Sequence, residues 1–107
     1  MLIASVSFSQ HSIFTVFTDG GEEFTLYVDG KKINETPKSR IADVKYSNEM
    51  ANLKLEFADG KIPRLTKNLA LKDVDNNYQK FTLIVKPNKK GVYKLRVNSF
   101  EAYTPTE

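Results

Sequence analysis

Side chains suited to catalytic or metal chemistry are few in this sequence. The only histidine is His11, in a Ser-Gln-His-Ser stretch typical of a surface turn, and there is no cysteine. A structural zinc site needs four ligands, usually cysteine and histidine, and a nucleophile–base pair needs an imidazole held by a third group. We therefore expect no catalytic residue, no metal site and no cofactor, and interpret the chain as a binding protein that is not an enzyme.

The spacing of Asp73, Asp75 and Asn77 matches the first ligand positions of a calcium-binding loop. Such a loop needs glycine at its sixth position, for a sharp turn, and a bidentate glutamate at its twelfth. The chain has Tyr78 and Ile84 at those positions. The segment is therefore interpreted as an acidic turn.

Basic and aromatic side chains are interleaved in the C-terminal half. Proteins that bind single-stranded nucleic acid without sequence preference combine cations, which follow the phosphates, with aromatic faces on which any base can stack. The residues expected to bind in this way are Lys61, Arg64, Lys80, Lys86, Lys94 and Arg96 for phosphates, and Tyr78, Phe100 and Tyr103 for bases. The alternative is structural, because a domain without cysteine or tryptophan must fill its interior with Phe and Tyr. Phe57, Phe81 and Tyr93 are expected in that interior.

The overall charge is compatible with an anionic partner without requiring one. Sixteen Lys and Arg against 13 Asp and Glu give a net charge of +3, and the pI is near 9.1. A small domain often carries such a charge for solubility alone. The N-terminal residues lack the pattern of a signal peptide, and no apolar run reaches the length of a membrane span. We expect a cytoplasmic protein without a membrane partner, in the host cytoplasm if the protein is viral.

The elements that must position these side chains are β-strands. Apolar and polar residues alternate with a period of two at 52–57, 80–86 and 93–98, which predicts strands with one buried face. The polar side of 80–86 carries Lys80, Thr82 and Lys86. The polar side of 93–98 carries Lys94, Arg96 and Asn98. If the two strands are neighbours, their polar sides form one basic stripe.

Turn residues separate the β-rich runs at regular intervals. Asp-Gly steps, which supply the positive φ angles of tight hairpin turns, occur at 19–20, 29–30 and 59–60, and a longer turn spans 87–91. The pattern predicts hairpins at 12–28, 24–34, 51–66 and 80–100, loops at 35–39 and 72–77, and a frayed end at 104–107. The chain is thus expected to be one all-β domain over residues 1–107. About eight strands would form either a small antiparallel barrel of the OB type or an immunoglobulin-like sandwich.

Residues 60–100 resemble the single-stranded DNA-binding (helix-destabilising) proteins of filamentous phages, which are small OB-type barrels that dimerise and coat the phage strand. The resemblance is carried by Gly60-Lys61 with Leu65 and Leu69, by the run from Asn77 to Phe81, and by Gly91 to Leu95 leading to Ser99-Phe100. It implies that Phe100 stacks on bases and that Tyr78 is its neighbour. The chain departs from the family after Gly60-Lys61, where Ile62-Pro63-Arg64 replaces Pro-Tyr.

The same C-terminal stretch also resembles the last strands of immunoglobulin-like sandwiches. Phe81 to Val85 is followed by Gly91, Tyr93, Leu95 and Val97 at alternate positions. In that architecture a tyrosine beside a glycine fixes the corner between two strands through its hydroxyl. This resemblance implies a protein-interaction or structural module, such as a virion component or a small inhibitor. The expected partner is therefore either single-stranded nucleic acid or a protein, and a homodimer is compatible with both.

Overall fold

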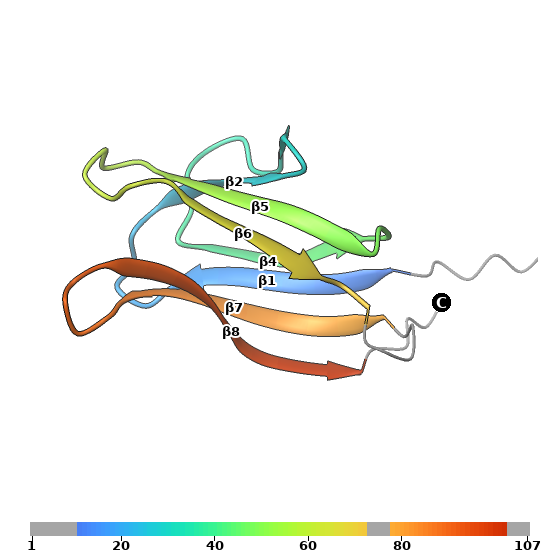
Figure 1. Cartoon of the computed structure of the whole chain (residues 1–107). Helices are drawn as coiled ribbons and strands as arrows, with labels where there is room; N and C mark the ends of the chain where they lie inside the picture. The colour runs from blue at the N-terminus through green and yellow to red at the C-terminus, as the bar shows by residue number, and fades with distance from the viewer. Residues whose placement is uncertain (1–10, 73–77, 103–107) are drawn as a thin grey trace, which may run out of the picture.

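Two four-stranded sheets make up the computed structural model, which describes residues 11–72 and 78–102 (Figure 1). The first sheet has the order β4-β1-β7-β8 and consists of β1 (Ser12–Thr18), β4 (Arg40–Tyr46), β7 (Gln79–Pro87) and β8 (Tyr93–Ala102). The second has the order β3-β2-β5-β6 and consists of β2 (Phe24–Val28), β3 (Lys31–Lys32), β5 (Met50–Phe57) and β6 (Leu65–Ala70). The prediction of an all-β fold with about eight strands is confirmed. The described strands form no closed barrel, so the arrangement is that of a β-sandwich.

Apolar side chains of both sheets share one core. Phe14 and Leu83 of the first sheet and Leu26 and Leu53 of the second are fully buried in it. Each occupies the inward positions of an alternating strand, as the period-two pattern predicts. Burying these side chains removes apolar surface from water and holds the two sheets together.

Three of the four predicted hairpins are confirmed. Strands β2 and β3 are joined by a two-residue turn in which Asp29 has a φ of 50° and Gly30 a φ of 84°, the two positive angles that a type I′ turn requires. Strands β5 and β6 pair from Leu55 opposite Leu65 to Met50 opposite Ala70, and β7 pairs with β8. The predicted pairing at 51–66 thus extends further, to residue 70.

The hairpin predicted at 12–28 is wrong, because β1 and β2 belong to different sheets. The Asp19-Gly20-Gly21 segment carries the chain across the sandwich instead of reversing it within one sheet. Strand β1 lies between β4 and β7, and it runs parallel to β7.

Strand β4 follows the predicted 35–39 loop and lies outside all four predicted hairpins. Its ladder with β1 slips between Phe14 and Val16, and Asp43 adopts a φ of 58° at that irregularity. Such a bulge interrupts the alternation by which a strand is recognised. Within residues 11–72 and 78–102, no helix is long and apolar enough to cross a membrane.

Candidate nucleic-acid interface

Four of the predicted phosphate-binding residues lie on one surface, the outward face of the first sheet. In a β-ladder, directly paired residues point to the same side. Lys86 is paired with Lys94, and Arg96 with Ile84, whereas Leu83 and Val85 between them point into the core. Lys80, which is paired with Glu101, lies four residues before Ile84 on β7 and therefore points to the same face. The basic stripe predicted for β7 and β8 is thus present in the geometry.

Strand β4 adds two cations to this surface that the sequence pattern did not indicate. Arg40 is paired with Phe17, and Lys45 with Ile13, on the outward side of β1. We define the basic face as the outward cations Arg40, Lys45, Lys80, Lys86, Lys94 and Arg96. Two carboxylates, Asp43 and Glu101, share this side of the sheet, so positive charge predominates.

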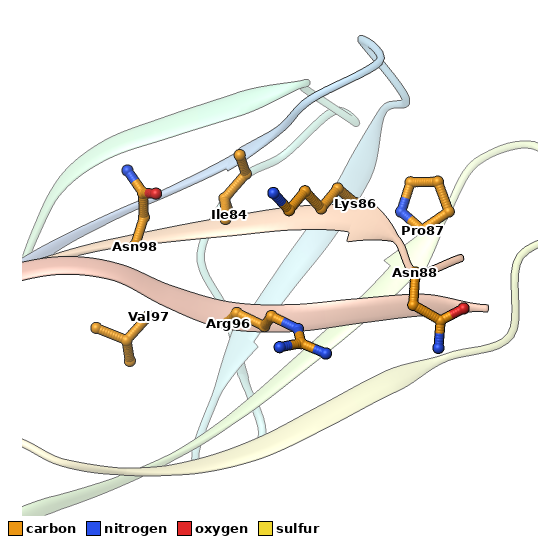
Figure 2. A pocket seen from close by; sticks show the side chains of 7 residues that line it. All are labelled: Ile84, Lys86, Pro87, Asn88, Arg96, Val97 and Asn98. Carbon is orange, nitrogen blue, oxygen red and sulfur yellow. The ribbon is translucent and has the colours of Figure 1, made fainter. Parts of the chain in front are cut away.

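A shallow pocket of about 260 Å³ lies on the β7–β8 half of the basic face. Lys86 and Arg96 line it from neighbouring strands, together with Ile84, which is paired with Arg96 (Figure 2). Pro87, Asn88, Val97 and Asn98 complete the lining. The pocket therefore places two cations beside the apolar side chain of Ile84, which suits an anionic group attached to a flat or apolar body.

A second depression of about 390 Å³ lies on the β4–β1 half. It is lined by Thr15, Phe17, Arg40, Asp43, Lys80 and Thr82. Phe17 is half-buried there, and its neighbour in the ladder on the β7 side is Ile84. An apolar row from Phe17 to Ile84 thus runs across the sheet between cations. Phe17 is the aromatic residue on this face, and the C-terminal sequence pattern could not have indicated it.

The remaining predicted residues lie elsewhere. Lys61 and Arg64 are exposed in the β5–β6 connection of the second sheet. Lys61 shares with Lys94 the lining of a pocket of about 590 Å³ between that connection and the β7–β8 turn. Tyr78 is half-buried before β7, where its hydroxyl donates to the Ser47 carbonyl at 3.4 Å and its ring lies under the Lys72 ammonium. Tyr103 falls outside the described residues, as do Asp73, Asp75 and Asn77.

Phe100 does not lie on the basic face. The β7–β8 ladder slips so that Thr82 faces Ser99 and Leu83 faces Val97, which leaves Asn98 as an extra residue. Beyond this bulge the alternation is reversed, and Phe100 is paired with the core residue Phe81, at 6.4 Å between ring centroids. The predicted stacking residue therefore lies on the inward side of the sheet, where it is 67% exposed.

His11 is buried at the start of β1, so the prediction of a surface turn is wrong. The reason is that β1 is an interior strand of its sheet and its burial extends back to this residue. Within the described part of the chain, no three His, Asp or Glu side chains are placed to hold a metal ion.

Two hydrogen bonds between a tyrosine hydroxyl and a carboxylate join strands of the first sheet to the connections on either side of β2. The Tyr93 hydroxyl donates to Glu22 Oε2 at 2.9 Å, and this bond is the main cause of a raised pKa of Tyr93. The Tyr46 hydroxyl donates to Asp29 Oδ2, which lowers the pKa of Asp29 and raises that of Tyr46. These contacts link the strands that carry the basic face to the rest of the sandwich.

Comparison with known proteins finds no matching family model, no matching curated protein and no matching solved structure.

Proposed function

We propose that this protein binds single-stranded nucleic acid, with little dependence on sequence, through the basic face. The observation that carries the proposal is the register of the first sheet, which aligns six cations from β4, β7 and β8 on one outward surface. A polyanion in contact with several of these cations would release condensed counterions, the main driving force of sequence-independent binding.

A sheet face is also a suitable platform for unpaired bases. Some proteins that bind single-stranded RNA lay bases on the face of a four-stranded sheet, where aromatic side chains stack against them. Here Phe17 and Ile84 supply half-buried apolar surface between Arg40 and Arg96. With one aromatic ring on the described part of this face, phosphate contacts would provide most of the affinity and base stacking little of it.

Salt dependence is the direct test. If four of the six cations contact phosphates, the slope of log affinity against log salt is about −3 for a single strand. Raising the salt from about 50 to 200 mM would then weaken binding by about 50-fold. Fluorescence anisotropy with labelled oligonucleotides of mixed sequence measures this change. Absence of binding at the lower salt would overturn the proposal.

Charge-neutralising variants locate the surface. Lys80→Gln and Lys86→Gln lie on β7, away from the sheet edge, and each is expected to reduce the magnitude of the salt slope by about 0.7. Lys32→Gln removes an exposed lysine from β3 of the second sheet and is the matched control. Equal losses in the control and the two β7 variants would show that net charge, and not the basic face, is responsible.

A second candidate function is protein interaction. It is favoured by a specific observation, the exposed apolar side chains Val97 and Phe100 on the edge strand β8. Exposed apolar side chains on an edge strand are a common basis for pairing with another chain. A protein that has only this function would show no salt-dependent affinity for oligonucleotides.

A further inference from the structure

Strand β8 is the longest edge of the sandwich. It is the last strand of the first sheet, so along residues 93–102 one side pairs with β7 and the other forms no ladder with a described strand, although β8 contacts β6 of the second sheet. The two edge strands of the second sheet are shorter: β3 has two residues and β6 has six. An edge of ten residues presents a row of backbone donors and acceptors to which another strand can pair.

The bulge at Asn98 separates two short stretches of β8 in which the side chains point inward and outward in mirrored order. Before it, Arg96 points outward and Val97 inward; after it, Phe100 points inward and Glu101 outward. Figure 2 shows Val97 and Asn98 projecting to opposite sides of the strand. Reading outward from the bulge in either direction therefore gives a polar residue, an apolar inward residue and a charged outward residue. The two charges have opposite signs.

This pattern is complementary to itself. In an antiparallel pair of two β8 strands related by a two-fold axis between residues 98 and 99, Val97 of one copy lies opposite Phe100 of the other. Arg96 then lies opposite Glu101, and each contact occurs twice. A regular strand cannot pair in this way about such an axis, because residues 98 and 99 would direct their backbone groups to opposite edges. The bulge removes this obstacle, since its extra residue shifts the alternation of the strand by one position, so that Val97 and Phe100 point to the same side.

We propose that β8 is a dimerisation edge whose partner is the β8 strand of a second copy of this chain. The dimer would join the two first sheets into one continuous eight-stranded sheet. Pairing would cover Val97 and Phe100, which are 36% and 67% exposed in the single chain. A heterologous strand could use the same backbone groups. The second copy is favoured because the Arg96–Glu101 and Val97–Phe100 matches are present within this one sequence.

A charge-swap experiment tests the proposal with the full chain. Sedimentation equilibrium gives the monomer–dimer constant of the unaltered protein, Arg96→Glu, Glu101→Arg and the double variant. Each single substitution replaces two attractive cross-strand pairs by two repulsive ones and is expected to weaken dimerisation by about tenfold or more. The double variant restores the opposite-charge pairs and is expected to recover most of the lost affinity.

Recovery of affinity in the double variant distinguishes a loss of strand pairing from a general effect on folding. Phe100→Asp is a second variant, which introduces charge into the apolar contact and is expected to give a monomer with an unchanged circular dichroism spectrum. Thr66→Asp, on the exposed side of β6 in the other sheet, is the control and should leave the constant unchanged. A monomer at all concentrations, or a double variant no better than the single ones, would overturn the proposal. Neither result bears on oligonucleotide binding by Lys80 and Lys86.

Discussion

At the scale of the residue, Tyr93 shows how one hydroxyl supports the sandwich. It is half-buried and packs beside Phe57 of the second sheet, with 6.4 Å between the ring centroids. Its hydroxyl donates to Glu22 Oε2, while the other carboxylate oxygen of Glu22 is buried without a hydrogen-bond partner among the described residues. The carboxylate therefore depends on Tyr93 for its solvation inside the protein.

We expect Tyr93→Phe to lower the melting temperature by a few degrees, because the Glu22 carboxylate loses its hydrogen-bond donor. Thermal unfolding followed by circular dichroism measures the change. Adding Glu22→Gln to the Tyr93→Phe chain should recover part of the loss, since a neutral amide is less costly to desolvate than a carboxylate. An unchanged melting temperature in Tyr93→Phe would contradict this role.

The same hydrogen bond predicts a dependence on alkaline pH. The folded protein raises the pKa of Tyr93, so the bond stabilises the fold below the ordinary pKa of tyrosine and is lost as the pH rises through the folded pKa. The stability difference between the unaltered chain and Tyr93→Phe is therefore expected to shrink at high pH.

At the scale of the element, Asn34 takes the place of a missing strand. Strand β3 pairs with β2 only at Tyr27 and Val28, and on the same side Phe24 makes an isolated bridge with Lys38, which leaves the Leu26 N–H between them without a strand partner. The buried Asn34 amide fills this role: its Oδ1 accepts from the Leu26 N–H at 2.8 Å, and its Nδ2 donates to the Phe24 carbonyl at 3.0 Å. A third hydrogen bond joins Nδ2 to the Thr36 carbonyl at 2.7 Å and fixes the loop that follows.

Asn34→Ala is expected to reduce the free energy of unfolding by about 1–3 kcal/mol, because it leaves the Leu26 N–H of β2 without its partner, whereas the Phe24 carbonyl still accepts from the Lys38 N–H. Urea denaturation gives the value. Asn52→Ala is the matched control: the exposed Asn52 amide bonds only to the Asn68 side chain, at 2.8 Å, and its loss should cost less than about 1 kcal/mol. Similar losses in the two variants would refute the special role of Asn34.

Strands with one polar face could be predicted from the sequence, whereas their partners could not. Alternation indicated β5, β7 and β8 correctly because each has a buried and a solvated side. Alternation says nothing about which strands are neighbours. It therefore missed the parallel β1–β7 pairing, which joins segments more than sixty residues apart.

The two bulges account for the other differences at the candidate site. The irregularity at Asp43 concealed β4, and with it Arg40 and Lys45. The extra residue Asn98 turned Phe100 away from the basic face, although strict alternation places it beside Lys94 and Arg96. A bulge depends on the partner strand as well as on local sequence, so no local pattern could have indicated either one.

At the scale of the whole molecule, the Asp29–Tyr46 contact lies at the start of β1, where Tyr46 pairs with Ser12, and the Glu22–Tyr93 contact lies at its other end, where the Thr18 hydroxyl donates to the Glu22 carbonyl. Asp29 lies in the β2–β3 turn, and Tyr46 ends β4. The Asp29 carboxylate also accepts from the Asn52 N–H at 2.8 Å. Since the Tyr46 hydroxyl is the main cause of the lowered pKa of Asp29, and the Asn52 N–H adds to it, the folded state favours the ionised carboxylate.

This preference determines whether the stability of the fold rises or falls as the pH is lowered. A carboxyl whose pKa is lower in the folded than in the unfolded state stabilises the fold above its unfolded pKa, and that contribution is lost as the pH falls through the folded value. Asp29→Asn removes the titrating group. The variant is therefore expected to be less stable than the unaltered chain near neutral pH, with the difference in stability narrowing as the pH falls through and below the ordinary pKa of aspartate.

Urea denaturation of the unaltered chain and of Asp29→Asn across this pH range measures the difference. Asp19→Asn, which removes an exposed carboxylate from the β1–β2 connection, is the control for net charge. If the difference in stability from the unaltered chain narrows as much for Asp19→Asn, the acid dependence reflects the overall charge of the protein. If the narrowing is confined to Asp29→Asn, the acid dependence arises from this single hydrogen-bonded carboxylate, and its ionisation contributes to the contact between the two sheets.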